Sequence, residues 1–428
     1  MVPALPALPG ELWTHIFLIL VPLDGLLDPL RDEEAGNGEH HEHLTCWKST
    51  LRTKLSIVGT CSRWRSLAME LLWKILYIRS LRELEVISRI LQASRYRYIV
   101  GAKGSMVLPH MNGYGQWVRR VETCIPLNQK IVEQAYYAEH VGRLLSCCSR
   151  LTIYINRNPM PIITTPSTIV DALSSLKHVE RLEWSGTEGL SVGELTYLLR
   201  SSPRVRKLVL GWVLLTSSRL TSAIHGSPLT IQTLTDLSFD LSIPNRAHLS
   251  YASRSWVLLS VRTLTVTLGV ITWYRDLAIL LERIGTALVS LRLIAIKNPS
   301  MRGGYWVDLL VHCPNLTCLS FDVEKMPILP ESVHLPHLTS VGLEGCVPDF
   351  HPVDVYDRPE SDRREQLTEH LLALRYRAQT LRTIRMIGKE FMTEEWKQPR
   401  VARNWMHWKA DLKEVGVHLV NQDGKPII

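Results

Sequence analysis

Residues 179–210 read VERLEWSGTEGLSVGELTYLLRSSPRVRKLVL, and this stretch contains the pattern that decides the fold. It opens with VERLEW from Val179 and closes with VRKLVL from Val205. In both runs an apolar residue is followed by two variable residues, an apolar residue, one variable residue and another apolar residue. The closing alternation is typical of a strand with one buried face. Between the runs, ELTYLLRSS has helical spacing and ends before Pro203, which cannot extend a helix. Each unit therefore predicts a helix followed by a strand.

Further copies of this run recur about 28 residues apart, near the 20 to 29 residues expected of leucine-rich repeats. The other clean copies begin at Leu234, Val261, Leu288, Leu316, Leu338, Leu381 and Leu412. Weaker copies begin at Val118 and Cys148. One unit cannot bury its apolar face alone, so neighbouring units must stack. The chain resembles a leucine-rich-repeat protein over residues 118–428, which implies an α/β solenoid of horseshoe form.

The first 80 residues have a different pattern and predict a small all-α domain. A helix is expected from LPGELWTHIF, which starts at Leu8, and a second one from Leu51. The polar stretch RDEEAGNGEHHEH, near 31–43, separates them and predicts a mobile acidic and histidine-rich insert. Residues 81–117 are expected to form a linker and a capping helix. Within the repeats, an inserted loop is expected near 349–369, where the spacing between copies is longest.

Two motifs in this N-terminal region resemble an F-box. LPGELWTHIF is similar to the opening of that domain, and CSRWRSL, from Cys61, is similar to its closing segment. The chain departs from the family pattern at Thr60, where an apolar residue usually precedes the cysteine, and its insert between the two halves is longer than usual. The short F-box followed by irregular repeats resembles fungal, basidiomycete-type F-box domain-containing proteins.

The resemblance implies the substrate-recognition subunit of an SCF-type cullin-RING ubiquitin ligase. The F-box would bind a Skp-type adaptor, and the repeats would bind a protein substrate. It assigns adaptor binding, or support of the adaptor-binding helices, to Leu8, Pro9, Leu12, Ile16, Phe17, Val58, Trp64 and Leu67. The same apolar residues could instead form the internal core of a helical cap. The alternative function is a repeat scaffold that binds protein or nucleic acid without a ligase.

The variable strand positions of the repeats are candidates for substrate contact, because they face away from the leucine core. Their charges are mixed and sum to about minus one over the predicted strands, so they offer no basic track for phosphates. We therefore expect a protein substrate rather than nucleic acid, with Arg181, Asp236, Asp240 and Arg292 as its contacts. The alternative is a solvated row of side chains without a ligand.

Composition gives further information on the type of partner and on the cellular compartment. The 428 residues carry 49 Lys and Arg against 41 Asp and Glu, a net charge of +8 that permits an acidic partner. Eight cysteines are too few for a disulfide framework and point to a reducing compartment. The N-terminus lacks the pattern of a signal peptide, and no apolar run is long enough for a membrane span. A cytoplasmic or nuclear protein without a membrane partner is expected.

Two motifs could indicate an enzyme or a metal protein. Residues 189–193 match the G-x-S-x-G pattern of a hydrolase nucleophile, but Ser191 with Glu194 three residues later also predicts a capping box. Five residues separate the serine from the preceding strand, so the helix cap is the preferred interpretation. The histidines and glutamates of residues 39–43 could bind zinc, but a solvated loop is preferred. The chain is therefore expected to be no enzyme, with no catalytic residues, bound metal or cofactor.

Overall fold

The structure is a computed structural model that divides into two compact units, Met1–His225 and Gly226–Ile428. The residues that it describes are 9–20, 26–30, 39–101, 104–109, 113–126, 131–158, 167–185, 190–211, 228–241, 247–268, 274–295, 308–323, 325–344, 360–387, 408–421 and 425–426.

The first unit begins with three helices that form the helical module: α1 (Gly10–Leu20), α2 (Glu39–Thr60) and α3 (Ser62–Trp73). Helix α3 starts at an N-cap, where the Cys61 sulfur accepts a hydrogen bond from the Trp64 backbone N–H. The mobile insert predicted over 31–43 is wrong for residues 39–43, which form the start of α2. No Gly or Pro interrupts the chain from Glu39 until Gly59, so the helix extends N-terminal to its apolar part. Residues 31–38 lie outside the described residues.

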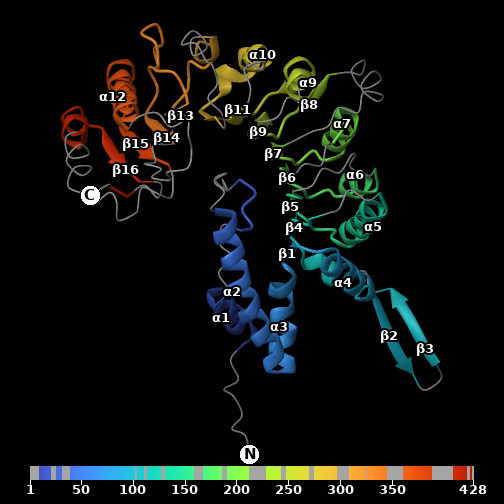
Figure 1. The fold of residues 1–428 in the computed structure, drawn as a ribbon. Helices are drawn as coiled ribbons and strands as arrows, with labels where there is room; N and C mark the ends of the chain where they lie inside the picture. Colours follow the sequence, from blue (N-terminus) through green and yellow to red (C-terminus); the bar gives the residue numbers. More distant parts are fainter. Residues whose placement is uncertain are drawn as a thin grey trace, which may run out of the picture. The chain divides into compact units, whose positions relative to one another are not determined.

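The rest of the first unit alternates strands of a parallel sheet with helices (Figure 1). Its sheet strands are β1 (Ile75–Ile78), β4 (Arg120–Thr123), β5 (Ile153–Asn156), β6 (Arg181–Trp184) and β7 (Lys207–Leu210). Neighbours in this order pair in parallel. The accompanying helices are α4 (Leu81–Ala93), α5 (Ile131–Cys147), α6 (Ser167–Ser174) and α7 (Val192–Ser201).

The repeat sheet begins earlier than the expected boundary at residue 118. Strand β1 lies inside the predicted 1–80 domain and pairs with β4. The run LWKILY from Leu72 has the repeat pattern, but it directly continues a helical sequence, so the pattern alone does not separate it from that helix. The expected linker at 81–117 also contains an antiparallel hairpin of β2 (Tyr96–Gly101) and β3 (Gly104–Pro109). It ends in the 3-10 helix η1 (Tyr114–Trp117).

The second unit has a parallel sheet of the same kind, with neighbours paired in chain order. Its strands are β9 (Asp236–Leu241), β11 (Thr263–Leu268), β12 (Ser290–Ala295), β13 (Cys318–Asp322), β14 (Ser340–Glu344), β15 (Thr383–Met386) and β16 (His418–Val420). Strands β8 (Leu229–Ile231) and β10 (Trp256–Leu258) form a separate parallel pair. The helices are α9 (Ala247–Ser255), α10 (Tyr274–Ile284) and α12 (Glu360–Arg377), with the 3-10 helix η3 (Gly285–Ala287) after α10.

Two sequence predictions for this unit need correction. The loop expected near 349–369 is wrong for residues 360–369, which belong to α12; residues 349–359 lie outside the described part. The last repeat copy, from Leu412, is misplaced, because residues 408–414 are helical and the strand starts at His418. In both places a charged sequence with alternating apolar residues supports a helix as well as a loop or strand.

The core of each unit follows the leucine pattern. In β11 buried and half-buried residues alternate strictly, with Leu264, Val266 and Leu268 inside. The apolar residue two positions before a strand is also buried, as at Val179, Val205 and Val261. The chain is therefore an α/β protein whose helix–strand units pair in parallel, which is the arrangement of leucine-rich repeats.

Candidate partner-binding surfaces

An aromatic cluster joins α1 to α3 in the helical module. The Trp64 ring lies 4.8 Å from the Trp13 ring and 5.2 Å from the Phe17 ring, measured between centroids. Phe17 is fully buried in a core that also contains Leu26, Ile57 and Leu71, among others. These contacts fix the face that α1 presents to the rest of the module.

Beside this packed face, α1 also presents apolar residues to solvent. Leu12 is 49 % exposed and Ile19 is 67 % exposed, with the partly buried Ile16 between them on the same helical face. Leu20 on α1 and Leu55 on α2 are also more than half exposed. We call Leu12, Ile16 and Ile19 the α1 stripe. Their i, i+4 and i+7 spacing makes them a continuous apolar surface.

The residues predicted to bind an adaptor separate by burial. Phe17 belongs to the core, whereas Leu12 and Pro9 are exposed and Leu8 lies outside the described residues. Those that are partly buried and pack against the core are Ile16, Val58, Trp64 and Leu67. Sequence reasoning missed Ile19, which continues the spacing of Leu12 and Ile16 by one further turn and could have been found by that signal.

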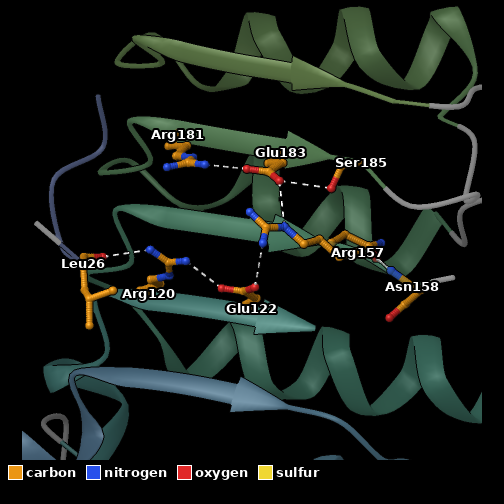
Figure 2. Close-up of polar contacts among 9 residues, drawn as sticks. Leu26, Arg120, Glu122, Arg157, Asn158, Arg181, Glu183 and Ser185 are labelled. Carbon is orange, nitrogen blue, oxygen red and sulfur yellow. Dashed lines mark hydrogen bonds and ion pairs between the residues drawn. The ribbon is translucent and has the colours of Figure 1, made fainter. Parts of the chain in front are cut away.

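Charged side chains form a buried ladder across β4 and β6 of the first unit (Figure 2). On β4, Arg120 donates to Glu122 over 2.6 Å. On β6, Arg181 donates to Glu183, also over 2.6 Å. Arg157, directly after β5, donates to Glu183 over 2.9 Å and lies 3.4 Å from a Glu122 oxygen. Arg157 therefore connects the two Arg–Glu pairs into one network.

Burial and charge act in opposite directions on Glu183. Removal from water would raise the pKa of this carboxyl, but Arg157 and Arg181 more than offset that cost and hold the pKa well below its usual value. Ser185 donates a further hydrogen bond over 3.0 Å. Glu183 is therefore an anion inside the protein, and its charge depends on both arginines.

The ladder also connects the strands to the helical module. Arg120 donates over 3.0 Å to the backbone carbonyl of Leu26, a residue of the core of the module. Figure 2 shows Leu26 on a separate segment facing Arg120. The hydrogen bond fixes this segment against the strand face of the first unit.

Arg181 is therefore not the exposed substrate contact that the sequence predicted. Its side chain is only 2 % exposed and its guanidinium is used within the chain. The prediction assumed that every variable strand position faces solvent. In this unit Arg120, Glu122 and Glu183 are buried as well, because polar residues at these positions pair with one another.

The corresponding face of the second unit is more open. Asp236 and Asp240 on β9 are half-buried, and the Thr235 hydroxyl donates to Asp236 over 2.5 Å. Arg292 on β12 donates over 2.7 Å to Glu344 on β14, so it reaches across the intervening strand. The structure thus leaves three of the four predicted substrate contacts partly accessible and brings Arg292 together with an acidic partner.

The motif at Ser191 is a helix cap. Its hydroxyl accepts from the Glu194 backbone N–H over 3.3 Å, and the Glu194 carboxylate accepts from the Ser191 N–H over 2.9 Å. Both bonds of a capping box are thus present at the start of α7. Within the described ranges, no group of three metal-ligating side chains occurs. Of the helices in that same part of the chain, none has the length and hydropathy needed to cross a membrane.

No protein-family model matches the chain, and no curated protein matches it in sequence. Among solved structures, it is similar to a leucine-rich repeat-containing protein, LegL7, from Legionella pneumophila. That match has 16 % identity and a TM-score of 0.34, and it covers 73 % of this chain and 77 % of the other. The repeat architecture therefore rests on the strand pairing of this chain itself.

Proposed function

We propose that the chain is a non-catalytic substrate-recognition subunit of an SCF-type ubiquitin ligase. In this proposal the helical module is an F-box that binds a Skp-type adaptor, and the repeat strands bind a protein substrate. The α1 stripe is the observation that supports the adaptor role most strongly.

The α1 stripe supports the proposal because α1 is already held by other residues. Trp13 and Phe17 contact Trp64 of α3, whereas Leu12 is 49 % exposed and Ile19 is 67 % exposed. Exposed apolar patches on soluble proteins commonly mark interaction surfaces. Leu12 and Ile16 of the stripe also fall within the sequence segment that resembles the opening of an F-box, and Ile19 lies two residues after it.

The second unit supports the substrate role. Its strand face combines Asp236 and Asp240 with Thr263, Thr265 and Thr267, all of them partly accessible. Mixed charge and hydroxyl groups suit a polypeptide that is bound by hydrogen bonds and ion pairs. The first unit contributes less to this surface, because its charged ladder is buried.

Co-purification with a Skp-type adaptor, followed by calorimetric titration, tests the adaptor role. We expect micromolar or tighter binding by the wild type. The double variant Leu12→Ala/Ile19→Ala should bind at least about tenfold more weakly, because central apolar anchors typically contribute more than 1 kcal/mol each. Both side chains are exposed, so the variant should unfold at the same temperature as the wild type.

Val132→Ala provides the matched control, since Val132 is an exposed apolar residue on α5, outside the helical module. It should bind the adaptor as the wild type does. If the wild type does not bind the adaptor at all, the ligase role is wrong and a repeat scaffold without a ligase becomes the better proposal. If Val132→Ala weakens binding equally, the α1 stripe is not the contact surface.

A further inference from the structure

A row of basic residues lies in the turns that lead into the strands of the first unit. Helices α5, α6 and α7 end at Cys147, Ser174 and Ser201, and each is followed three residues later by a cation. These cations are Arg150, Lys177 and Arg204. The regular position repeats the geometry of the solenoid. The three residues come shortly before β5, β6 and β7, and these strands pair side by side in this order (Figure 1).

Neighbouring residues in the same turns extend this row. Arg119 donates to the Arg150 carbonyl over 3.3 Å, and Arg204 lies 3.0 Å from a ring nitrogen of His178. We call the complete set the basic edge: Arg119, Arg150, Lys177, His178, Arg204 and Arg206. Besides His178, this set has five cations, and the described turns contain one carboxylate, that of Glu180, which lies 3.9 Å from Arg206.

Two cations of this edge have a carboxylate nearby, Glu180 beside Arg206 and Glu70 near Arg119, whereas the other three do not. In the described part of the chain, no carboxylate lies within ion-pair distance of Arg150, Lys177 or Arg204. Burial and the nearby Arg150 charge lower the pKa of Arg119. The C-terminal ends of α5, α6 and α7 point toward the edge, and their dipoles favour cations there. The fold can therefore keep this positive surface stable while it has no ligand.

We propose that the basic edge binds an acidic polypeptide segment, a contact separate from the adaptor and from the strand face. Charge complementarity identifies the occupant. Adjacent strands are about 4.8 Å apart, close to the roughly 5 to 6 Å between side chains three or four positions apart on a helix. Glutamates on one face of a bound helix are therefore spaced to contact the cations of successive turns of the basic edge. Single-stranded nucleic acid is usually bound by stacking on exposed aromatic rings, and the described turns after α5 to α7 contain no Phe, Tyr or Trp.

The test uses the full chain and a fluorescent peptide with glutamates at i, i+4 and i+7, with binding followed by anisotropy. The same peptide with glutamine at those positions is the ligand control. We expect binding in about 0.05 M salt and a strong loss in about 0.5 M salt, because screening weakens exposed charge pairs. Charge reversal in Arg150→Glu/Arg204→Glu should weaken binding by about tenfold or more, since it turns attraction into repulsion.

Arg262→Glu is the matched protein control. Arg262 is an exposed arginine directly before β11 in the second unit, where the preceding residues Leu259 to Val261 carry no charge. It should leave binding unchanged, and the melting temperature of each variant should confirm folding. An equal loss of peptide binding with Arg262→Glu overturns the proposal. The proposal is also overturned if the wild type does not bind the peptide at concentrations up to about 100 µM, since a dissociation constant above that value is weak even for a charged surface. Single-stranded RNA that binds more tightly than the peptide, and is lost with the double reversal, would assign the edge to nucleic acid instead.

Discussion

Glu183 shows at the scale of one residue why the strand face of the first unit is closed. A buried carboxylate is tolerated only where its charge is compensated, and Arg181 and Arg157 both donate to it. These charged side chains bind one another, so they are not available to a ligand. The pairing of Arg181 with Glu183 follows from their i, i+2 positions on one strand. The approach of Arg157 depends on where the chain leaves β5, which the sequence pattern does not contain.

Removing one partner of this network should therefore be costly. Arg181→Met keeps the side-chain volume but leaves Glu183 with less compensation, so we expect a loss of about 3 kcal/mol in the free energy of unfolding. Arg181→Met combined with Glu183→Gln should recover about 1 kcal/mol or more of that loss, because the two residues are coupled. Urea unfolding measures both. A cost below about 1 kcal/mol for Arg181→Met would mean that water already compensates Glu183.

His370 predicts a pH dependence in the second unit. Its ring on α12 is fully buried, 5.2 Å from the Phe321 ring, and burial lowers its pKa to about 4, a shift that the carbonyls of Met326 and Val323 oppose only in part. In the unfolded chain its pKa is about 6.5, so the unfolded state binds the extra proton between these values. The stabilisation is complete above about pH 6.5, decreases as the pH falls, and is lost by about pH 4, a total near 3 kcal/mol.

The variant His370→Phe isolates this contribution. Its free energy of unfolding should depend less on pH between about 6.5 and 4 than that of the wild type, because only the histidine is removed from the titration. Urea unfolding at several pH values gives the two curves. Parallel curves would show that His370 is not buried as a neutral ring.

At the scale of elements, the sequence predicted the strands well and the connections poorly. The runs from Val179, Val205 and Val261 begin two residues before β6, β7 and β11, because the leucine period is set by burial on one face. Polar segments were misassigned at residues 39–43 and 360–369, where helix propensity and loop composition overlap. The sequence of the β2–β3 hairpin lacks the repeat pattern, so the sequence did not predict this hairpin. On the α1 stripe, two of three residues were identified from the sequence.

Glycine positions give a prediction for the packing of elements. A Cβ at Gly115, in η1, would overlap the carbonyl oxygen of Cys147 at the end of α5, whereas a Cβ at Gly59 in α2 would meet nothing within 4 Å. Gly115→Ala should therefore lower the free energy of unfolding by about 2 kcal/mol through overpacking. Gly59→Ala should raise it by about 0.5 to 1 kcal/mol, because alanine is the better helix former. Thermal melts compare the two, and a stabilising Gly115→Ala would contradict the close approach of η1 to α5.

For the whole molecule, the surfaces proposed for the adaptor and for the substrate belong to different compact units. The α1 stripe lies in Met1–His225, and Asp236 with Asp240 lies in Gly226–Ile428. In repeat proteins each unit interacts mainly with its neighbours, so a change in one repeat acts mainly on the repeats beside it. Independent sites contribute additively to free energy, usually to within about 0.5 kcal/mol.

Charge reversal in Asp236→Lys/Asp240→Lys should therefore leave adaptor affinity within about twofold of the wild type, which corresponds to less than about 0.5 kcal/mol. When the charge reversal is combined with Leu12→Ala/Ile19→Ala, adaptor binding should be no weaker than with the two α1 changes alone. Calorimetric titration of the four proteins with the adaptor measures this. A larger loss from the reversal would mean that the second unit takes part in adaptor binding, because neither aspartate belongs to the helical module. If adaptor binding is unchanged, any effect of the charge reversal is confined to substrate binding.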